Sequence, residues 1–395
     1  MASDIARTML ATVRDRATRY PVVTITGPRQ SGKTTLCKAA FPDHPYVNLE
    51  QPRTLEQALA DPTGFLARHA DGAIFDEVQR APQLLSAIQV ACDERPEPGR
   101  FVLSGSHNFQ LQGAIAQSLA GRTTVFDLLP LARDEMRAFP DAPRTLTESL
   151  FAGGYPRIFS QSIPPAEFHA DYVRTYVERD VRLLLNVQDL GTFQTFLRLC
   201  AGRSGSLLNL SSLAADCGIT HPTAKAWIGV LEASYLVRRV HPWFHNLGKR
   251  LVKTPKLYFL DSGLLCWLLG IREPDQLDTH PLRGAIFESW VAAEVMKARA
   301  NLGIADPLWF YRDQSGAEVD LVVEAARRFV LVEAKSGARV APDAGTTLVR
   351  VAEALQERAL GKTAVRAIAY GGDERATVGG TELLPWHQVD RFAWS

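Results

Sequence analysis

Residues 27–34 read G-P-R-Q-S-G-K-T and match the phosphate-binding pattern G-x-x-x-x-G-K-[ST]. The two glycines let the backbone curl so that its N–H groups point at phosphate oxygens, and the helix expected after the loop adds a positive dipole end. Lys33 would then place a charge on the outer phosphates of ATP, and the Thr34 hydroxyl would be a ligand for Mg²⁺. A glycine-rich turn with a chance lysine is the alternative. The expected nucleotide-binding residues are Gly27, Pro28, Arg29, Gln30, Ser31, Gly32, Lys33, Thr34 and Thr35.

Two adjacent carboxylates, Asp76 and Glu77, follow the apolar stretch 73–75. Parallel sheets present functional groups at the carboxyl ends of their strands, which is also where a phosphate-binding loop opens. Asp76 would hold Mg²⁺ through water, and Glu77 would polarise the water that attacks the γ-phosphate. A surface turn with two acids is the alternative. The upstream loop favours the nucleotide site.

Two further candidates lie downstream. Ser106, or its neighbour Asn108, ends the next strand and would touch the γ-phosphate or the attacking water; a capped strand-to-helix turn is the alternative. Arg122 follows a helix and a glycine. Its guanidinium would stabilise transition-state charge, either within the chain or across a subunit interface, or would form a surface ion pair.

Alternating strands and helices must position these residues. The amphipathic segment 1–20 predicts a helix that packs on the first domain, and helical patterns such as 54–60 and 83–93 separate the strands. This alternation is typical of a three-layer α/β fold with a parallel sheet. The predicted strands cover residues 22–26, 46–49, 73–75, 100–103 and 123–128.

The middle of the chain is predicted to be helical and then to form a winged helix-turn-helix. Residues 209–218 read as a helix with an asparagine cap and a terminal glycine, 221–233 as a second helix, and 236–240 as a wing strand. The second helix would enter the major groove of DNA, although such modules also bind proteins. A basic strip that could lie on phosphates follows: Lys249, Arg250, Lys253 and Lys256.

Several short motifs resemble the prokaryotic AAA-superfamily ATPases that carry a C-terminal domain of uncharacterised function. The resemblance implies an AAA-type ATP hydrolase with a small helical lid after its core, and it covers nearly the whole chain. The motifs are G-P-R-Q-S-G-K-T-T at 27–35, F-D-E-V-Q at 75–79, L-S-G-S at 103–106, L-A-G-R at 119–122, G-G-Y-P at 153–156 and K-L-Y-F-L-D-S-G at 256–263.

The last part of the chain resembles the PD-(D/E)XK nuclease fold. Glu333 and Lys335 lie two residues apart on one predicted strand, so both side chains leave the same sheet face. The resemblance implies that Asp320 and Glu333 bind Mg²⁺, that Glu288 completes the metal shell from a helix, and that Lys335 orients or activates water. The same acids could instead bind nucleic-acid ends or form only an ion-pair network.

Composition and charge restrict the remaining choices. The chain has 395 residues, a net charge of +1 and 22% charged residues, which argues against a globally basic DNA-coating protein. No apolar run reaches membrane-spanning length, and five scattered cysteines indicate reduced thiols, so we expect a cytoplasmic protein without a membrane partner. The expected domains are an ATPase core at 1–140, a lid at 141–205, a winged helix at 206–245 and a nuclease-like domain at 246–395.

Two functions fit this organisation. The first is a Mg²⁺-dependent ATPase that acts on DNA in processing, repair or defence. The second is an ATP-dependent switch that acts on a protein partner through non-catalytic C-terminal modules. AAA-type ATPases often form rings, so a homo-oligomer is possible in either case, with Arg122 supplied across its interface.

Overall fold

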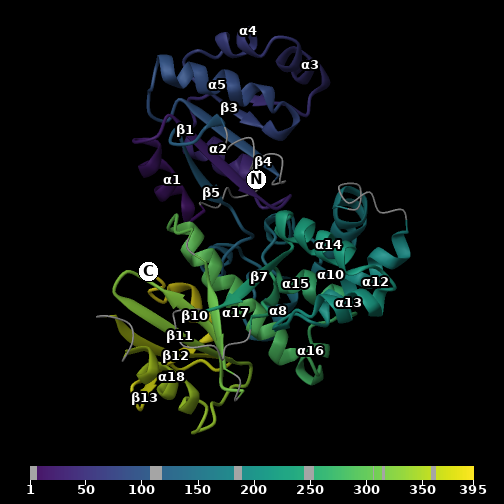
Figure 1. Ribbon diagram of the computed structural model, residues 1–395, viewed down its shortest axis with the longest axis vertical. Coiled ribbons are helices and arrows are strands. Elements are labelled where there is room, and N and C mark those ends of the chain that lie inside the picture. The colour runs from purple at the N-terminus through teal and green to yellow at the C-terminus, as the bar shows by residue number, and fades with distance from the viewer. Residues whose placement is uncertain are drawn as a thin grey trace. The chain divides into compact units, whose positions relative to one another are not determined.

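The computed structural model describes residues 7–106, 118–181, 189–243, 253–305, 307–313, 316–356 and 362–395. The chain forms two compact units, which are treated separately below (Figure 1). The first unit comprises Met1–Leu131 together with two short segments, Ala233–Tyr235 and Ala300–Gly303. The second comprises Ala132–Glu232, Leu236–Arg299 and Ile304–Ser395.

The first unit is built on a five-stranded parallel sheet, as the sequence predicts. Strand β1 lies between β4 and β5, so the loop that follows β1 emerges near the middle of the carboxyl edge. In spatial order the strands are β2 (Tyr46–Asn48), β3 (Ala73–Asp76), β4 (Phe101–Ser106), β1 (Val22–Gly27) and β5 (Thr123–Asp127).

Helices cover both faces of this sheet and complete three layers. Successive side chains of a strand point to opposite faces. Val22 therefore packs with α3, α4 and α5 in one apolar cluster, while Val23 packs with α1 and α2 in another. The helices of the unit are α1 (Met9–Ala17), α2 (Lys33–Ala40), α3 (Pro52–Ala60), α4 (Pro62–Ala67) and α5 (Gln83–Glu94), with a single 3₁₀ turn η1 (Val78–Arg80).

The second unit begins with short helices punctuated by proline. Thr145 and Glu148 form a reciprocal cap at the start of α8, and Asp189 caps α12 through the N–H groups of Gly191 and Thr192. The predicted helical character of this region is confirmed, whereas its role as a lid stays a prediction. The helices are α7 (Arg133–Met136), α8 (Leu146–Ala152), α9 (Pro156–Ser160), α10 (Pro165–Tyr172), the π-helical stretch η2 (Val173–Val181) and α12 (Leu190–Ala201).

Two helices follow at the positions expected for a helix-turn-helix. Helix α13 (Leu210–Cys217) starts at Asn209, which accepts a hydrogen bond from the Ser212 N–H, and stops at Gly218, whose φ is 66°. Helix α14 (His221–Ala233) leads into strand β7 (Val237–Pro242). The assignment of this segment as a winged helix stays a prediction.

A nine-stranded sheet forms the rest of the second unit. Strand β7 pairs with β9 in parallel, with His241 opposite Trp309, so the predicted wing strand is continuous with the C-terminal sheet. The four-part domain division stays a prediction. In spatial order the strands are β13 (Ala376–Val378), β14 (Thr381–Pro385), β12 (Thr363–Tyr370), β11 (Arg328–Lys335), β10 (Glu318–Glu324), β9 (Trp309–Arg312), β7, β8 (Lys256–Phe259) and β6 (Ser206–Leu207).

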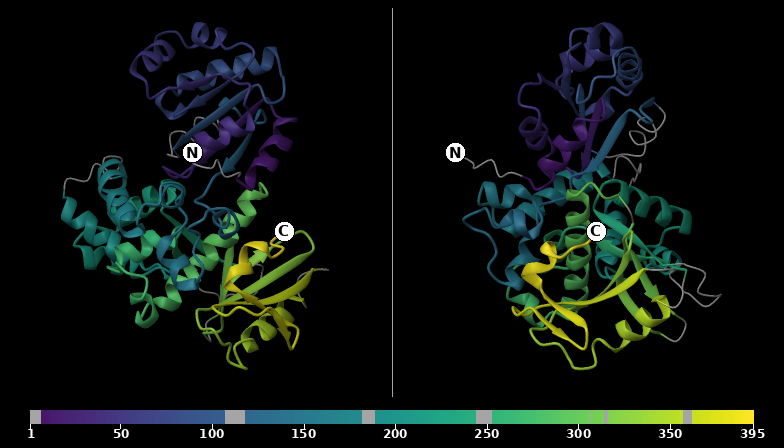
Figure 2. Two further views of the ribbon diagram at one scale, coloured as in Figure 1. Left: turned by 180° about the vertical axis from the view of Figure 1, so that it is seen from behind. Right: turned by 90° about the vertical axis from the view of Figure 1, so that its left-hand side faces the viewer.

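Helix α18 (Thr346–Gln356) lies against this sheet in the ribbon views (Figure 2). Its apolar face, which includes Leu348 and Val351, packs in one cluster with residues of the strands. The longer helix α17 (Arg283–Asn301) carries Glu288. None of the helices in the described ranges is long and apolar enough to cross a membrane. The remaining helices are α15 (Ser262–Leu268), α16 (Gln276–Thr279) and the 3₁₀ segment η3 (Trp386–Arg391).

Candidate active site

The phosphate-binding loop connects β1 to α2 in the expected place. Gly27 has a φ of 152° and Gly32 a φ of 92°, conformations that side-chain-bearing residues rarely adopt. A β-carbon on Gly27 would lie 2.3 Å from the carbonyl oxygen of Leu128. The first glycine of the motif is therefore required by a close backbone approach as well as by the curl of the loop.

Lys33 is folded back onto the loop that carries it. Its Nζ donates hydrogen bonds to the carbonyl oxygens of Gly27, at 3.1 Å, and Pro28, at 2.9 Å. The side chain is 7% exposed. Burial lowers the pKa of Lys33, and the nearby carboxylates of Glu77 and Asp76 oppose that shift. The ammonium group thus has two neutral acceptors that a phosphate could replace.

Asp76 meets Thr34 at the carboxyl edge of the sheet. The Thr34 hydroxyl donates to Asp76 Oδ2 at 2.7 Å, and the Tyr46 hydroxyl donates to the same oxygen at 2.6 Å. The Ser104 hydroxyl donates to Oδ1. Burial alone would raise the pKa of Asp76, but the hydrogen bonds from Ser104, Tyr46 and Thr34 outweigh it, so the pKa is lowered overall. The carboxylate and the Thr34 hydroxyl therefore converge as ionised and neutral oxygen ligands, a set that suits Mg²⁺.

Glu77 occupies an unusual backbone conformation directly after β3. Its φ of 58° lies in the left-handed region, which costs a non-glycine residue about 1–3 kcal/mol. The Glu77 carboxylate accepts a hydrogen bond from the side-chain amide of Gln79. Such strain at a residue beside Asp76 turns the second carboxylate away from the direction that a regular strand would give it.

The two weaker candidates have different outcomes. Ser106 is the last residue of β4, but its side chain and the neighbouring Asn108 lie outside the described residues. Arg122 forms an ion pair with Asp93, with Nε–Oδ1 and Nη2–Oδ2 distances of 2.6 and 2.9 Å. Its backbone carbonyl accepts from the Val22 N–H, at the amino edge of the sheet and opposite the loop. Within this chain, Arg122 is thus in the surface ion pair that the sequence left open; its role across a subunit interface stays a prediction.

The sequence analysis did not identify Arg7, whose guanidinium binds the backbone of the phosphate-binding loop. Arg7 is 7% exposed and donates to the carbonyl oxygens of Ser31, at 2.7 Å, and Leu129, at 2.8 Å. The contacts of Tyr46 and Ser104 with Asp76 were also missed: Ser104 belongs to the L-S-G-S motif at 103–106, but its spacing does not show which carboxylate its hydroxyl meets. An arginine before an apolar helix gives no signal of its own either.

A second network adjoins the loop through Thr26, the residue before Gly27. The Thr26 hydroxyl donates to Asp127 Oδ1 at 2.7 Å and lies 3.0 Å from the Tyr235 hydroxyl, which also donates to Asp127. Tyr235 belongs to the short segment Ala233–Tyr235 of the first unit, at the end of α14. Its φ of 56° is left-handed.

The predicted nuclease-like residues gather around a lysine. Lys256 is 2% exposed, and its Nζ lies 2.8 Å from Glu288 Oε1 and 3.4 Å from Asp320 Oδ1. Glu318 pairs with the same ammonium group. The expectation that Lys256 belongs to an exposed basic strip is therefore wrong: the lysine neutralises buried carboxylates. Lys253 is described but forms no part of this cluster, and Lys249 and Arg250 lie outside the described residues.

Glu333 and Lys335 lie on the next strand. Lys335 Nζ donates to Glu333 Oε1 at 2.7 Å, and Asp320 Oδ2 accepts from the Ala334 N–H at 2.9 Å. Burial and the charge of Asp320 raise the pKa of both Glu333 and Glu288 to about 7. No group of three or more His, Cys, Asp or Glu side chains in the described ranges could hold a metal ion. The ammonium of Lys256 pairs with two of the three expected metal ligands, Glu288 and Asp320, so this arrangement favours an ion-pair network.

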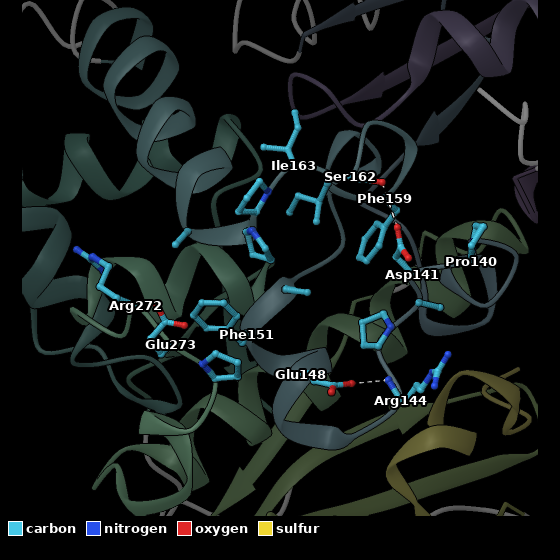
Figure 3. A pocket seen from close by; sticks show the side chains of 18 residues that line it. Pro140, Asp141, Arg144, Glu148, Phe151, Phe159, Ser162, Ile163, Arg272 and Glu273 are labelled. Atoms are coloured by element: carbon cyan, nitrogen blue, oxygen red, sulfur yellow. Dashed lines mark hydrogen bonds between the residues drawn. The ribbon is translucent and has the colours of Figure 1, made fainter. Parts of the chain in front are cut away.

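A separate pocket of about 730 Å³ lies among the short helices of the second unit (Figure 3). The rings of Phe151 and Phe159 line it together with several prolines. Glu148 accepts from the backbone N–H of Arg144 at 2.7 Å at its border. None of the residues predicted to be functional lines this pocket.

Comparison with known proteins assigns the parts of the chain. A family model described as an AAA domain matches residues 19–137, and one described as domain of unknown function DUF4143 matches residues 283–389. Between them, a third model, domain of unknown function DUF8612, matches residues 143–275. The AAA match contains the phosphate-binding loop and the Asp76–Glu77 pair.

Two mycobacterial proteins are similar over most of their length. Uncharacterized proteins of Mycobacterium tuberculosis and Mycobacterium bovis are each 32% identical over 326 residues, which span 82% of this chain and 72% of theirs. Among solved structures, a Walker-type ATPase of Pyrococcus abyssi is 15% identical with a TM-score of 0.41, covering 66% of this chain and 94% of its own.

Proposed function

The chain belongs to the family of P-loop ATPases in which an AAA domain precedes a DUF4143 domain, and we propose that it couples Mg²⁺-dependent ATP hydrolysis to action on DNA. The observation that carries the Mg²⁺ site is the 2.7 Å contact between the Thr34 hydroxyl and Asp76. The two groups come from separate motifs of the sequence and meet at one edge of the sheet.

Each residue of the site has a role that its present contacts support. Backbone N–H groups of the loop that follow Pro28 hold the phosphates, and Lys33 exchanges the carbonyls of Gly27 and Pro28 for phosphate oxygens. Thr34 and Asp76 would hold Mg²⁺, which would supply positive charge against the phosphates. Glu77 leaves Gln79 and accepts a proton from the attacking water.

The proposed action on DNA is supported by helices α13 and α14. The first turns of α14 present the exposed side chains of His221 and Lys225, while Ala224 and Trp227 are buried against the unit. This is the division of faces that a recognition helix requires. The side chains are only modestly basic, so sequence-independent contacts would come from elsewhere in the second unit.

The test is ATP hydrolysis by the full chain, with single-stranded, duplex and branched DNA added separately. We expect hydrolysis to require Mg²⁺, to stop on chelation, and to rise several-fold with at least one DNA form. The variant Lys33→Ala controls for contaminating ATPases because its nucleotide binding is expected to be lost. Hydrolysis that responds to none of the DNA forms would refute the action on DNA and leave the ATPase intact.

A switch that acts on a protein partner is the second candidate. The observation that favours it is the low charge of α14, where Lys225 is the one exposed cation in the first two turns. Nucleotide state would then set affinity for the partner. ATP-dependent capture of one defined protein, combined with no response to DNA, would select this function.

A further inference from the structure

Five arginines line one pocket of about 660 Å³ in the second unit: Arg133, Arg137, Arg144, Arg375 and Arg391. Asp373 is the one carboxylate in its lining. Five arginines against one aspartate leave a formal charge of +4, since burial lowers the pKa of the remaining titratable residue, His387, and favours its neutral form. Guanidinium groups gathered around one hollow repel one another, and an anion in the hollow would relieve that repulsion.

Arg133 is a buried member of this group with unmet hydrogen-bonding capacity. It is 6% exposed and donates from Nη2 to the carbonyl oxygen of Pro143 at 2.9 Å. Its Nε and Nη1 groups are buried without a hydrogen-bond partner among the described residues. Its guanidinium carbon lies 5.2 Å from the centroid of the Trp386 ring. Burial lowers the pKa of Arg133, and the charges of Asp390, Glu294 and Asp134 oppose that shift, yet none of these carboxylates accepts a hydrogen bond from Nε or Nη1. A phosphate in the pocket would supply the missing acceptors.

The other arginines are held by contacts that leave them accessible. Arg391 pairs with Asp134 at 2.6 Å, and Arg375 pairs with Glu382 at 2.7 Å, while both arginines remain more than half exposed. Arg137 donates to the carbonyl oxygen of His387 and lies 3.3 Å from Asp134. Such exposed ion pairs contribute little stability, so a more highly charged anion could compete for these guanidinium groups.

The pocket lies at the same sheet edge as Glu333 and Lys335. Strands β11, β12 and β14 run parallel, and their registers place Lys335, Tyr370 and Pro385 side by side. Trp386 directly follows Pro385, and Arg375 follows Tyr370 by five residues. Because neighbouring strands are about 4.8 Å apart, the backbone of Lys335 lies about 10 Å from that of Pro385, which directly precedes Trp386 of the pocket. A polyanionic chain crossing this edge would meet both places.

We propose that the arginine-lined pocket is a phosphate-binding site, and that its ligand is a backbone phosphate of the nucleic acid on which the protein acts. Planar guanidinium forks match the geometry of phosphate oxygens, and the buried Trp386 leaves no open ring for a base. The source of the phosphate rests on the proposed action on DNA. Phosphate binding itself does not, since free nucleotides and pyrophosphate carry the same chemistry.

The experiment compares the full chain with the double variant Arg144→Gln/Arg391→Gln, which removes two exposed charges and keeps Arg133. The control is Arg53→Gln/Arg157→Gln, two exposed arginines outside the pocket. Affinity for a labelled single-stranded oligonucleotide is measured by anisotropy between about 50 and 200 mM salt. We expect the pocket variant to bind about tenfold or more weakly, with the slope of log K against log salt reduced by about 0.7 for each lost phosphate contact. The control variant should match the parent.

A second arm uses pyrophosphate as the probe, in a Lys33→Ala background that removes binding at the loop. If the pocket variant loses pyrophosphate affinity but keeps its DNA affinity, the site is a phosphate site whose source is a free anion. If the parent binds no DNA, the action on DNA fails and the pyrophosphate arm alone decides the pocket. Equal binding of both probes by the parent and the pocket variant overturns the inference.

Discussion

Three hydroxyl groups, those of Thr34, Tyr46 and Ser104, donate hydrogen bonds to Asp76. Thr34 and Asp76 could be predicted, because each belongs to a motif with fixed spacing. Tyr46 and Ser104 could not, because a hydroxyl becomes a partner only when the strand order places β2 and β4 on either side of β3. Their hydrogen bonds keep the pKa of Asp76 low despite its burial. The ionised state of Asp76 therefore depends on Tyr46 and Ser104, two residues whose hydroxyls the sequence did not assign to this carboxylate.

Glu77→Gln tests the proposed general base. Glutamine keeps the size of the side chain but cannot accept a proton, so we expect ATP turnover to fall about 10²–10⁴-fold. ATP affinity should remain close to that of the parent, because the loop and Lys33 are untouched. Steady-state hydrolysis and binding of a fluorescent ATP analogue measure the two effects. Turnover equal to the parent's would remove Glu77 from this role.

Asp390→Asn tests a buried carboxylate in the second unit. Burial and the charge of Glu294 raise the pKa of Asp390 to about 6, partly offset by Arg137 and reinforced by Asp134. Both Asp390 oxygens lack a hydrogen-bond partner in the described part of the chain. The folded state thus holds a proton that an unfolded aspartic acid, with a pKa of about 3.9, releases at lower pH. This stabilisation is complete below about pH 4 and is lost as the pH rises through 6.

The asparagine variant should therefore gain stability relative to the parent, by about 2–3 kcal/mol at most, between pH 4 and pH 7. Urea unfolding of both proteins at a series of pH values measures the difference. The conservative control Asp373→Asn changes a carboxylate that is largely exposed, and its difference from the parent should stay nearly flat. A pH-independent difference for Asp390→Asn would contradict a raised pKa.

At the scale of elements, apolar patterns predicted the first unit better than the second. The five parallel strands read as continuous β-branched or apolar runs, because both faces of the sheet are covered by helices. The wing strand predicted at 236–240 was expected to belong to a separate domain, yet β7 pairs with β9 and continues the C-terminal sheet. The pairs His241–Trp309 and Pro242–Phe310 make this connection. The paired residues are about 70 positions apart, and the local sequence around either strand does not indicate that they pair.

Lys256 shows the same limit for a charged residue. It follows other lysines and an arginine in the sequence, which favoured an exposed basic strip. In the structure it lies on β8, where its ammonium contacts Glu288 of α17 and Asp320 of β10. Charge alone could not distinguish a solvated lysine from one that neutralises buried acids.

Gly27→Ala tests the close approach between the loop and the chain after β5. A β-carbon there would lie 2.3 Å from the Leu128 carbonyl oxygen, at a φ of 152° that disfavours alanine. We expect ATP binding to be lost and the free energy of unfolding to fall by about 1–3 kcal/mol. Gly284→Ala is the matched control, since its β-carbon would meet nothing within 4 Å and its φ is ordinary. Nucleotide titration and thermal unfolding of both variants measure these effects. Normal ATP affinity in Gly27→Ala would show that the loop backbone can shift to make room for the methyl group.

At the scale of the whole molecule, a chain of contacts links the phosphate-binding loop to helix α14. Helix α14 ends at Ala233, and two residues later the Tyr235 hydroxyl joins Thr26 and Asp127 beside the loop. Thr26 immediately precedes Gly27, so any change in loop conformation on phosphate binding would reach this network through one peptide bond. The covalent link from Tyr235 back to α14 then connects the loop to the helix proposed to contact DNA.

Tyr235→Phe tests that connection. Phenylalanine keeps the ring but removes the hydroxyl, while Thr26 and Asp127 retain their own 2.7 Å hydrogen bond. If the network transmits nucleotide state, a non-hydrolysable ATP analogue should change the DNA affinity of the parent and change that of the variant by a smaller factor.

By thermodynamic linkage, DNA must change the affinity for the analogue by the same factor in each protein. A hydrogen bond to a charged group contributes about 1.5–3 kcal/mol, so the coupling should weaken by about tenfold or more where it is that large. Both affinities, measured in both directions for the parent and the variant, form a closed cycle. Identical coupling in the two proteins would show that nucleotide state reaches DNA by another route, and unequal factors in the two directions would show that the measurements were not at equilibrium.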